Sequence, residues 1–234
     1  DAKDHRAGPG SEKATGQRLD AFPDRIDLRD WFYQPALISL PDSLVSCPLI
    51  KPAMILNQGQ EGACTGFALA AVINFLRAKQ KRTAIVSPRM LYELARRYDE
   101  WPGEAYEGSS ARGAIKAWAK HGVCLRSSWK DDQHGITHMS DAIIKQAMAA
   151  PGGAYYRIRP YNVRDMHTAL NETGILYATL MVHSGWAAPG SGKGEKPVRV
   201  DFVHGGRKAT LKLPVIRRHG SADGGHAVAL VGYT

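Results

Sequence analysis

Apolar residues recur every three to four positions through much of the first half of the chain, the spacing of helices that bury one face. The clearest run follows Cys64, where the apolar positions are Phe67, Ala68, Ala71, Val72, Phe75 and Leu76. This pattern predicts a helix over about 64–79. Similar patterns, together with helix start and stop signals, predict helices over 88–98, 111–121, 140–149 and 162–171.

From Gly174 onwards the pattern changes to alternation with a period of two, which is typical of strands. We expect strands over 175–182 and 226–233, with a β-hairpin between them around His204-Gly205-Gly206. Helices followed by strands indicate an α+β fold with segregated elements. Residues 21–56 contain five prolines, so this segment is expected to form extended connections and short strands.

Length and composition permit one large domain or two lobes, because 234 residues with 44% hydrophobic content can bury a substantial core. Residues 1–20 are polar and cannot fold alone, so we expect a flexible linker, a tail or a pro-segment remnant there. The chain begins without Met or an apolar signal segment, so a processed or trimmed product is expected. Its compartment is left open, with secretion or delivery as an effector among the alternatives. No apolar run is long enough to span a membrane.

The net charge of +9 is concentrated in residues 193–218, where eight Lys and Arg residues face only two acidic ones. One interpretation is a solvated basic face on the predicted hairpin. The other is attraction to an acidic substrate, inhibitor or membrane surface. No nucleic-acid-binding motif accompanies the charge, so no nucleic-acid partner is expected.

Cys64 is the strongest candidate for chemistry, because it lies where a glycine-containing loop meets the first predicted helix. Unpaired N–H groups and the helix dipole favour a thiolate at such a position and lower its pKa. A cysteine nucleophile needs a base, which is commonly a histidine distant in sequence. His226 lies 162 residues later, at the start of the glycine-flanked strand. Gln58, six residues before Cys64, can supply a neutral N–H donor.

An ordered set of motifs over residues 21–234 makes the chain resemble the papain family of cysteine peptidases, in its divergent bacterial form. The motifs are Asp27-Leu28-Arg29, Asn57-Gln58-Gly59, Gly62-Ala63-Cys64, Ser87-Pro88, Leu91-Tyr92, Gly108–Ile115, Gly122-Val123-Cys124, Gly225-His226-Ala227-Val228 and Val231-Gly232-Tyr233. The resemblance implies a two-lobed fold, with a helical lobe first, a β-rich lobe second and the active-site cleft between them.

The resemblance also implies roles for individual residues. Cys64 is the nucleophile, His226 is the base, and Gln58 with the Cys64 amide forms the oxyanion hole. Gly108 and Ser109 match the segment that binds the substrate backbone. The implied activity is endopeptidase cleavage of peptide or protein substrates through a thioester.

Three positions depart from the family pattern. Thr65 replaces the usual Trp after the nucleophile, and Glu61 replaces a cysteine whose disulfide partner falls near Tyr106 or Glu107. The family also places an Asn beyond the His, but none follows His226, so we expect the C-terminal part of the domain to be missing. Two alternatives therefore stay open: a catalytically degenerate binding module, and a Cys–His amidase, deamidase or transglutaminase-like effector.

The other cysteines and histidines give weaker signals. Cys47 and Cys124 are interpreted either as a pair or as two buried thiols. His134 and His138 are four residues apart, but Gly135 and the β-branched residues between them argue against a helix with a shared zinc face. We expect no metal and no cofactor.

Overall fold

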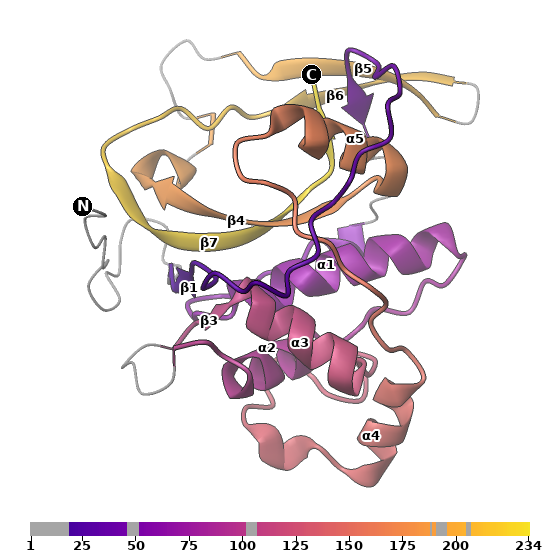
Figure 1. The fold of residues 1–234 in the computed structure, drawn as a ribbon, viewed down its shortest axis with the longest axis vertical. Coiled ribbons are helices and arrows are strands. Elements are labelled where there is room, and N and C mark those ends of the chain that lie inside the picture. The colour runs from indigo at the N-terminus through magenta and orange to yellow at the C-terminus, as the bar shows by residue number, and fades with distance from the viewer. Residues whose placement is uncertain (1–18, 46–51, 102–106, 188, 191–195, 205–206) are drawn as a thin grey trace.

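The computed structural model describes residues 19–234 except 46–51, 102–106, 188, 191–195 and 205–206. Within these residues the chain forms two lobes (Figure 1). The first half builds a helical lobe, and the second half builds a lobe of strands with one covering helix. The expected α+β architecture is therefore confirmed.

The helical lobe consists of α1 (Cys64–Lys79), α2 (Pro88–Arg97), α3 (Ala111–His121) and α4 (Asp141–Met148). Serine side chains begin three of these helices. Ser87 Oγ accepts from the Met90 N–H at 3.0 Å and Ser110 Oγ from the Gly113 N–H at 3.1 Å. Such caps satisfy N–H groups that the helix itself leaves unpaired. The predicted helices in this lobe are confirmed, with small differences at their ends.

The core of the helical lobe lies where α1, α2 and α3 meet. Its buried members are Leu69, Ala70, Ile73, Val86, Leu91, Ala95, Ala114 and Val123. Gly66 permits the contact between α1 and α2, because a Cβ there would lie 2.6 Å from the Tyr92 nitrogen. The close approach fixes the first turn of α1 against α2.

The second lobe is centred on an antiparallel pair, β4 (Leu176–His183) and β7 (Ala222–Leu230), in which Leu180 lies opposite His226. The helix α5 (Val163–Thr173) precedes β4, and β5 (Val198–His204) forms the expected hairpin with β6 (Arg207–Leu213). β7 begins four residues before the predicted start. The glycines there do not prevent pairing, since the ladder needs only backbone groups.

Short elements complete the fold. β1 (Ala21–Phe22) pairs in parallel with β3 (Ser109–Ser110), and β2 (Leu44–Val45) pairs with β8 (Gly232–Tyr233). In the described part of the chain there are also 3-10 turns: η2 (Pro52–Met54), η3 (Ile136–His138) and η4 (Ser184–Ala187). Among the described helices, none is both long and apolar enough to cross a membrane.

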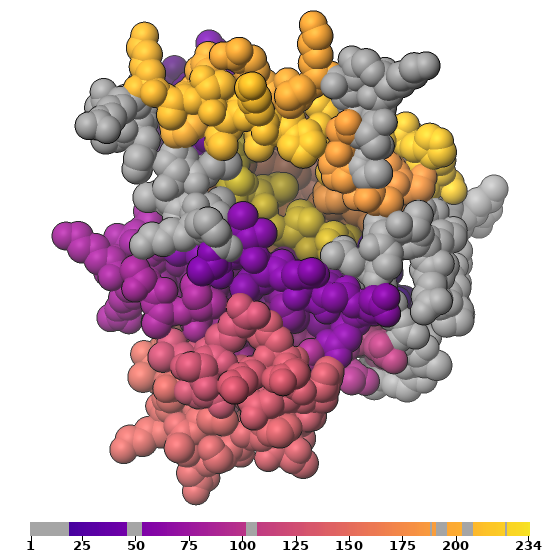
Figure 2. All heavy atoms as spheres, turned by 180° about the vertical axis from the view of Figure 1, so that it is seen from behind, coloured from indigo at the N-terminus to yellow at the C-terminus, as the bar shows by residue number. Residues whose placement is uncertain are grey.

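The two lobes meet where α1 packs against β4 and β7. The Tyr177 hydroxyl on β4 donates to the carbonyl oxygen of Thr65 at 3.0 Å. In Figure 2 the molecule is hollowed between the helical lobe and the strands above it. The structure thus places the start of α1 directly below the strand that carries His226.

Candidate active site

Cys64 is the first residue of α1, and only 1% of it is exposed. Its buried apolar neighbours are Ala21, Ala68 and Ala227. The N-cap residue of α1 is Ala63, which has no capping side chain, and the hydrogen bonds found among the described residues include no side-chain acceptor for the first turn. The backbones of Ala227 and Thr65 act to lower the pKa of the thiol, because they favour the thiolate.

Burial nevertheless raises the pKa of the Cys64 thiol to about 11, and the charge of Asp20 acts in the same direction. The sequence predicts the opposite shift, from the position of Cys64 at a helix start. Desolvation of the thiolate outweighs the helix start and the backbone hydrogen bonds in this state. At neutral pH the described site therefore holds a neutral thiol.

This buried thiol predicts a pH dependence of stability. The pKa of Cys64 is about 11 in the folded protein against an ordinary value of 9.0, so the protonated thiol stabilises the fold. Since the folded pKa is the higher one, this contribution is complete below pH 9 and lost as the pH rises towards 11. Between these values, we expect the free energy of unfolding to fall by about 2–3 kcal/mol more in the wild type than in Cys64→Ala. Chemical denaturation at both pH values measures this difference, and equal changes in the two proteins would contradict a buried thiol.

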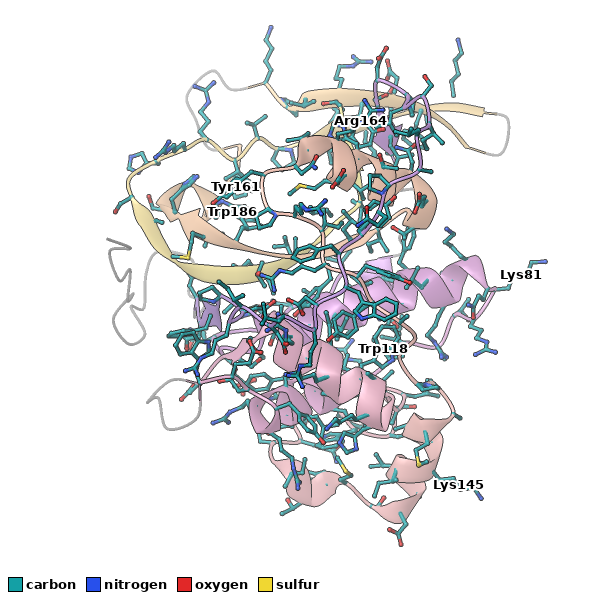
Figure 3. All side chains as sticks on the ribbon, viewed as in Figure 1. Lys81, Trp118, Lys145, Tyr161, Arg164 and Trp186 are labelled. Carbon is teal, nitrogen blue, oxygen red and sulfur yellow. The ribbon has the colours of Figure 1, made fainter. Side chains whose placement is uncertain are left out.

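His226 lies in β7, next to Ala227, which packs against Cys64. Its side chain is half-buried, and burial lowers its pKa. Within the described residues, its buried Nδ1 atom has no hydrogen-bond partner. The Trp186 ring of η4 stands edge-on to the imidazole, with ring centroids 6.4 Å apart, and Figure 3 shows Trp186 beside β4 and β7. Burial therefore favours the neutral form of both groups, the thiol of Cys64 and the imidazole of His226.

Gln58 lies in the loop that leads into α1. Its Nε2 atom donates to the carbonyl oxygen of Glu61 at 2.7 Å. The turn is closed by Asn57, whose Oδ1 atom accepts from the Gly59 N–H at 2.9 Å. Gly59 has a φ of +66°, which a side chain rarely tolerates. The loop thus fixes the orientation of the Gln58 amide shortly before the nucleophile candidate.

Ser109 is fully buried beside the start of α1. Its hydroxyl lies 2.5 Å from the Thr65 hydroxyl, so the two side chains share a hydrogen bond. The sequence identifies Thr65 only as a departure from the family pattern. In the structure this hydrogen bond ties Thr65, the residue after Cys64, to the segment of Gly108 and Ser109. The two predicted substrate-binding residues therefore do lie beside the candidate nucleophile.

The strand β1 and the residue before it occupy the space between β3 and β7. Ala21 lies opposite Ser109, and Asp20 forms a parallel bridge with Gly225. A Cβ on Gly108 would lie 1.7 Å from the Asp20 carbonyl oxygen, and one on Gly225 would lie 1.7 Å from that of Ala21. Only glycines allow this approach. The chain therefore covers its own candidate site, a feature that the sequence analysis missed although Gly108 and Gly225 border it.

An apolar cavity of about 300 Å³ opens beside Cys64 along one face of α1. It is lined by Phe67, Ala71 and Phe75 of this helix, by β7 beyond His226, and by the segment around Met54. Of the residues that the structure describes, no charged side chain lines it.

The remaining candidates are placed as follows. Cys124 is a free and fully buried thiol, so the alternative in which it pairs with Cys47 is wrong; Cys47 itself lies outside the described residues. His138 is the last residue of the 3-10 turn η3 and His134 precedes that turn, so the two do not share an α-helical face. His134 Nδ1 lies 3.0 Å from a Glu61 carboxylate oxygen. Within the described ranges, no group of three or more His, Cys, Asp and Glu side chains could hold a metal ion.

No protein-family model matches this chain, and no curated protein matches its sequence. Solved structures do match. Xylellain, a cysteine protease from Xylella fastidiosa, has a TM-score of 0.67 and 26% identity, and the match covers 94% of this chain and 81% of that one.

Two further structures share the fold at lower identity. Digestive procathepsin L 3 of the Tenebrio molitor larval midgut is 16% identical with a TM-score of 0.65, over 94% of this chain and 62% of its own. Procathepsin B S9 of Trypanosoma congolense is also 16% identical, with a TM-score of 0.62 over 92% of this chain and 70% of its own. The chain therefore has the papain-like fold of these structures and is similar to a solved papain-like cysteine protease.

Proposed function

We propose that this chain is a cysteine endopeptidase with Cys64 as nucleophile and His226 as base. The observation that carries the proposal is the packing of Cys64, at the start of α1, against Ala227, the neighbour of His226 on β7. This packing brings the strand that carries His226 to the start of α1, in a fold that a known cysteine protease shares.

The proposed reaction is acyl transfer. The Cys64 thiolate attacks the peptide carbonyl carbon, and the oxyanion accepts hydrogen bonds from Gln58 and from the Cys64 amide. When the C–N bond breaks, the His226 imidazolium gives its proton to the leaving amine. Water then attacks the thioester, with His226 accepting the proton, and releases the carboxylate and the free thiol.

The proposal includes a latent state, because the described site is not ready for this reaction. Burial favours a neutral thiol on Cys64 and a neutral imidazole on His226, instead of the reactive ion pair. The segment Asp20–Phe22 fills the space between Ser109 and Gly225, so a substrate backbone cannot enter there. Displacement of this segment hydrates the thiol and opens the cleft at the same time.

Replacing Ala21 by Trp is expected to expose Cys64. Ala21 is 6% exposed and packs against Cys64 and Ala227, so a large ring cannot fit without moving the strand. Overpacking costs about 1–3 kcal/mol, which corresponds to a roughly 5- to 150-fold larger open population. The rate of iodoacetamide alkylation of Cys64 at neutral pH, followed by mass spectrometry of the peptide, should rise by that factor.

Ile26→Trp is the matched control, because Ile26 lies in the same segment and is 94% exposed. Its alkylation rate should equal that of the wild type. An Ala21→Trp protein that is folded but as unreactive as the wild type would contradict the proposed cover.

The neutral thiol and the unpartnered His226 Nδ1 favour a second candidate, a binding module with the same fold and no catalysis. The Ala21→Trp protein separates the two. A binding module leaves its exposed Cys64 with an ordinary pKa near ~8.5, whereas a peptidase lowers the pKa of the exposed thiol. Alkylation at mildly acidic pH therefore decides between them.

A further inference from the structure

The Gln58 side chain has two N–H donors, and the structure shows a partner for one of them. An amide nitrogen carries two hydrogens, and one of them is donated to the Glu61 carbonyl oxygen at 2.7 Å. This bond fixes the plane of the amide and leaves the second hydrogen for another acceptor. The position of Gln58 therefore depends on the position of the Glu61 backbone.

The Glu61 backbone is in turn held through its own side chain. One carboxylate oxygen is paired with Arg89 Nη2, and the other lies 3.0 Å from His134 Nδ1. Arg89 is on α2, and its side chain is 4% exposed. Its Nε atom donates to the Asp131 carbonyl oxygen at 2.7 Å. A buried guanidinium with several partners has little freedom, so it gives Glu61 a fixed anchor.

The next turn of α2 holds a second loop of the site. The Tyr92 hydroxyl donates to the carbonyl oxygen of Glu107, the residue before Gly108. The Arg89 guanidinium lies over the Tyr92 ring, 5.6 Å from its centroid. The two loops also touch, because a Cβ on Gly62 would lie 3.1 Å from the Gly108 nitrogen. One face of α2 thus anchors the loop of Gln58 and the loop of Gly108.

We propose that Arg89 and Glu61 are positioning residues for the oxyanion-hole donor, and that Tyr92 does the same for the substrate-binding segment. Arg89 and Tyr92 together form a polar clamp on α2. Glu61 takes the place of a cysteine whose disulfide partner, as the family resemblance implies, falls near Tyr106 or Glu107. The clamp ties each loop to α2, in place of a covalent link between the loops. This inference rests on the proposed function only for its effect on catalysis.

The clamp predicts a loss of turnover without a comparable loss of binding. A misplacement of about 1 Å at a reacting group can cost roughly a hundredfold in rate. In the Ala21→Trp background, Arg89→Met and Glu61→Ala should lower kcat for a peptide substrate about 10- to 100-fold, with KM changed less than about threefold. Glu61→Ala removes the contact with the loop, and Arg89 keeps its ion pair with Glu93 and its hydrogen bond to the Asp131 carbonyl oxygen. This variant therefore tests the clamp even if Arg89→Met fails to fold.

Arg126→Met is the matched control. Arg126 pairs with the Asp131 side chain at the surface and does not contact the Gln58 loop in the described structure. It should keep the turnover of the parent. The alkylation rate of Cys64 should stay within about threefold of the parent in all variants, because the clamp acts on the donor and not on the thiol.

Hydrogen–deuterium exchange of the full-length proteins tests the clamp without any catalysis. In Arg89→Met and Glu61→Ala, the peptide that covers 57–63 should exchange at least about tenfold faster, with peptides from the middle of α1 unchanged. Unchanged exchange in this peptide overturns the clamp, whether or not the protein cleaves peptides. Faster exchange with unchanged kcat overturns the positioning role. If the Ala21→Trp protein itself cleaves no peptide, the proposed function is contradicted. The hydrogen–deuterium exchange measurement then still tests the clamp.

Discussion

Cys64→Ala is expected to lower kcat for peptide cleavage by about 10⁴-fold or more in the Ala21→Trp background, because the proposed thioester forms on the sulfur of Cys64. The side chain is fully buried at the start of α1, so removing its sulfur leaves a small cavity but keeps the helix. A near-complete loss of turnover in a variant that keeps its fold is the result expected for a nucleophile. Steady-state kinetics with a fluorogenic peptide measures the effect.

Cys124→Ala is the matched control, because Cys124 is also a free and fully buried thiol whose pKa burial raises to about 11. It packs in the core of the helical lobe with Met90 and Trp129, away from β7. We expect this variant to keep its turnover. Equal activity in the Cys64→Ala and parent proteins would show that another group performs the chemistry.

Gln58→Ala is expected to lower kcat about 10²–10³-fold, with a much smaller change in KM. The proposed donor acts on negative charge that exists only when the carbonyl has been attacked, so its loss affects the transition state more than the bound substrate. Gln60→Ala is the control, because Gln60 is exposed in the same loop. A large rise in KM with unchanged kcat would assign Gln58 to substrate recognition.

Much of the fold can be predicted from the sequence because its signals are local. The three-and-four spacing after Cys64 and the serines before α2 and α3 define helices through contacts and caps a few residues apart. The motif order indicates the papain-like fold, which the structure neighbours confirm. Cys64 packs against Ala227 on the strand of His226, which is where the order of the motifs leads us to expect it.

The rest depends on contacts between distant segments, which no local pattern encodes. Burial of Cys64 among Ala21, Ala68 and Ala227 reverses the predicted pKa shift of the thiol, because it removes the sulfur from solvent. In the sequence, Glu61 stands out only because it replaces a cysteine of the family pattern. The fold shows that its carboxylate pairs with the buried Arg89. Both features are set by the packing of the lobes and not by the residues next to them in the chain.

The most direct test of the central claim is the mass of the products that the Ala21→Trp protein forms from a defined peptide. The account predicts two fragments whose masses sum to that of the peptide plus one water, formed through Cys64 and absent in Cys64→Ala. An intact peptide, a shift of about one dalton from deamidation, or a cross-linked product would contradict an endopeptidase.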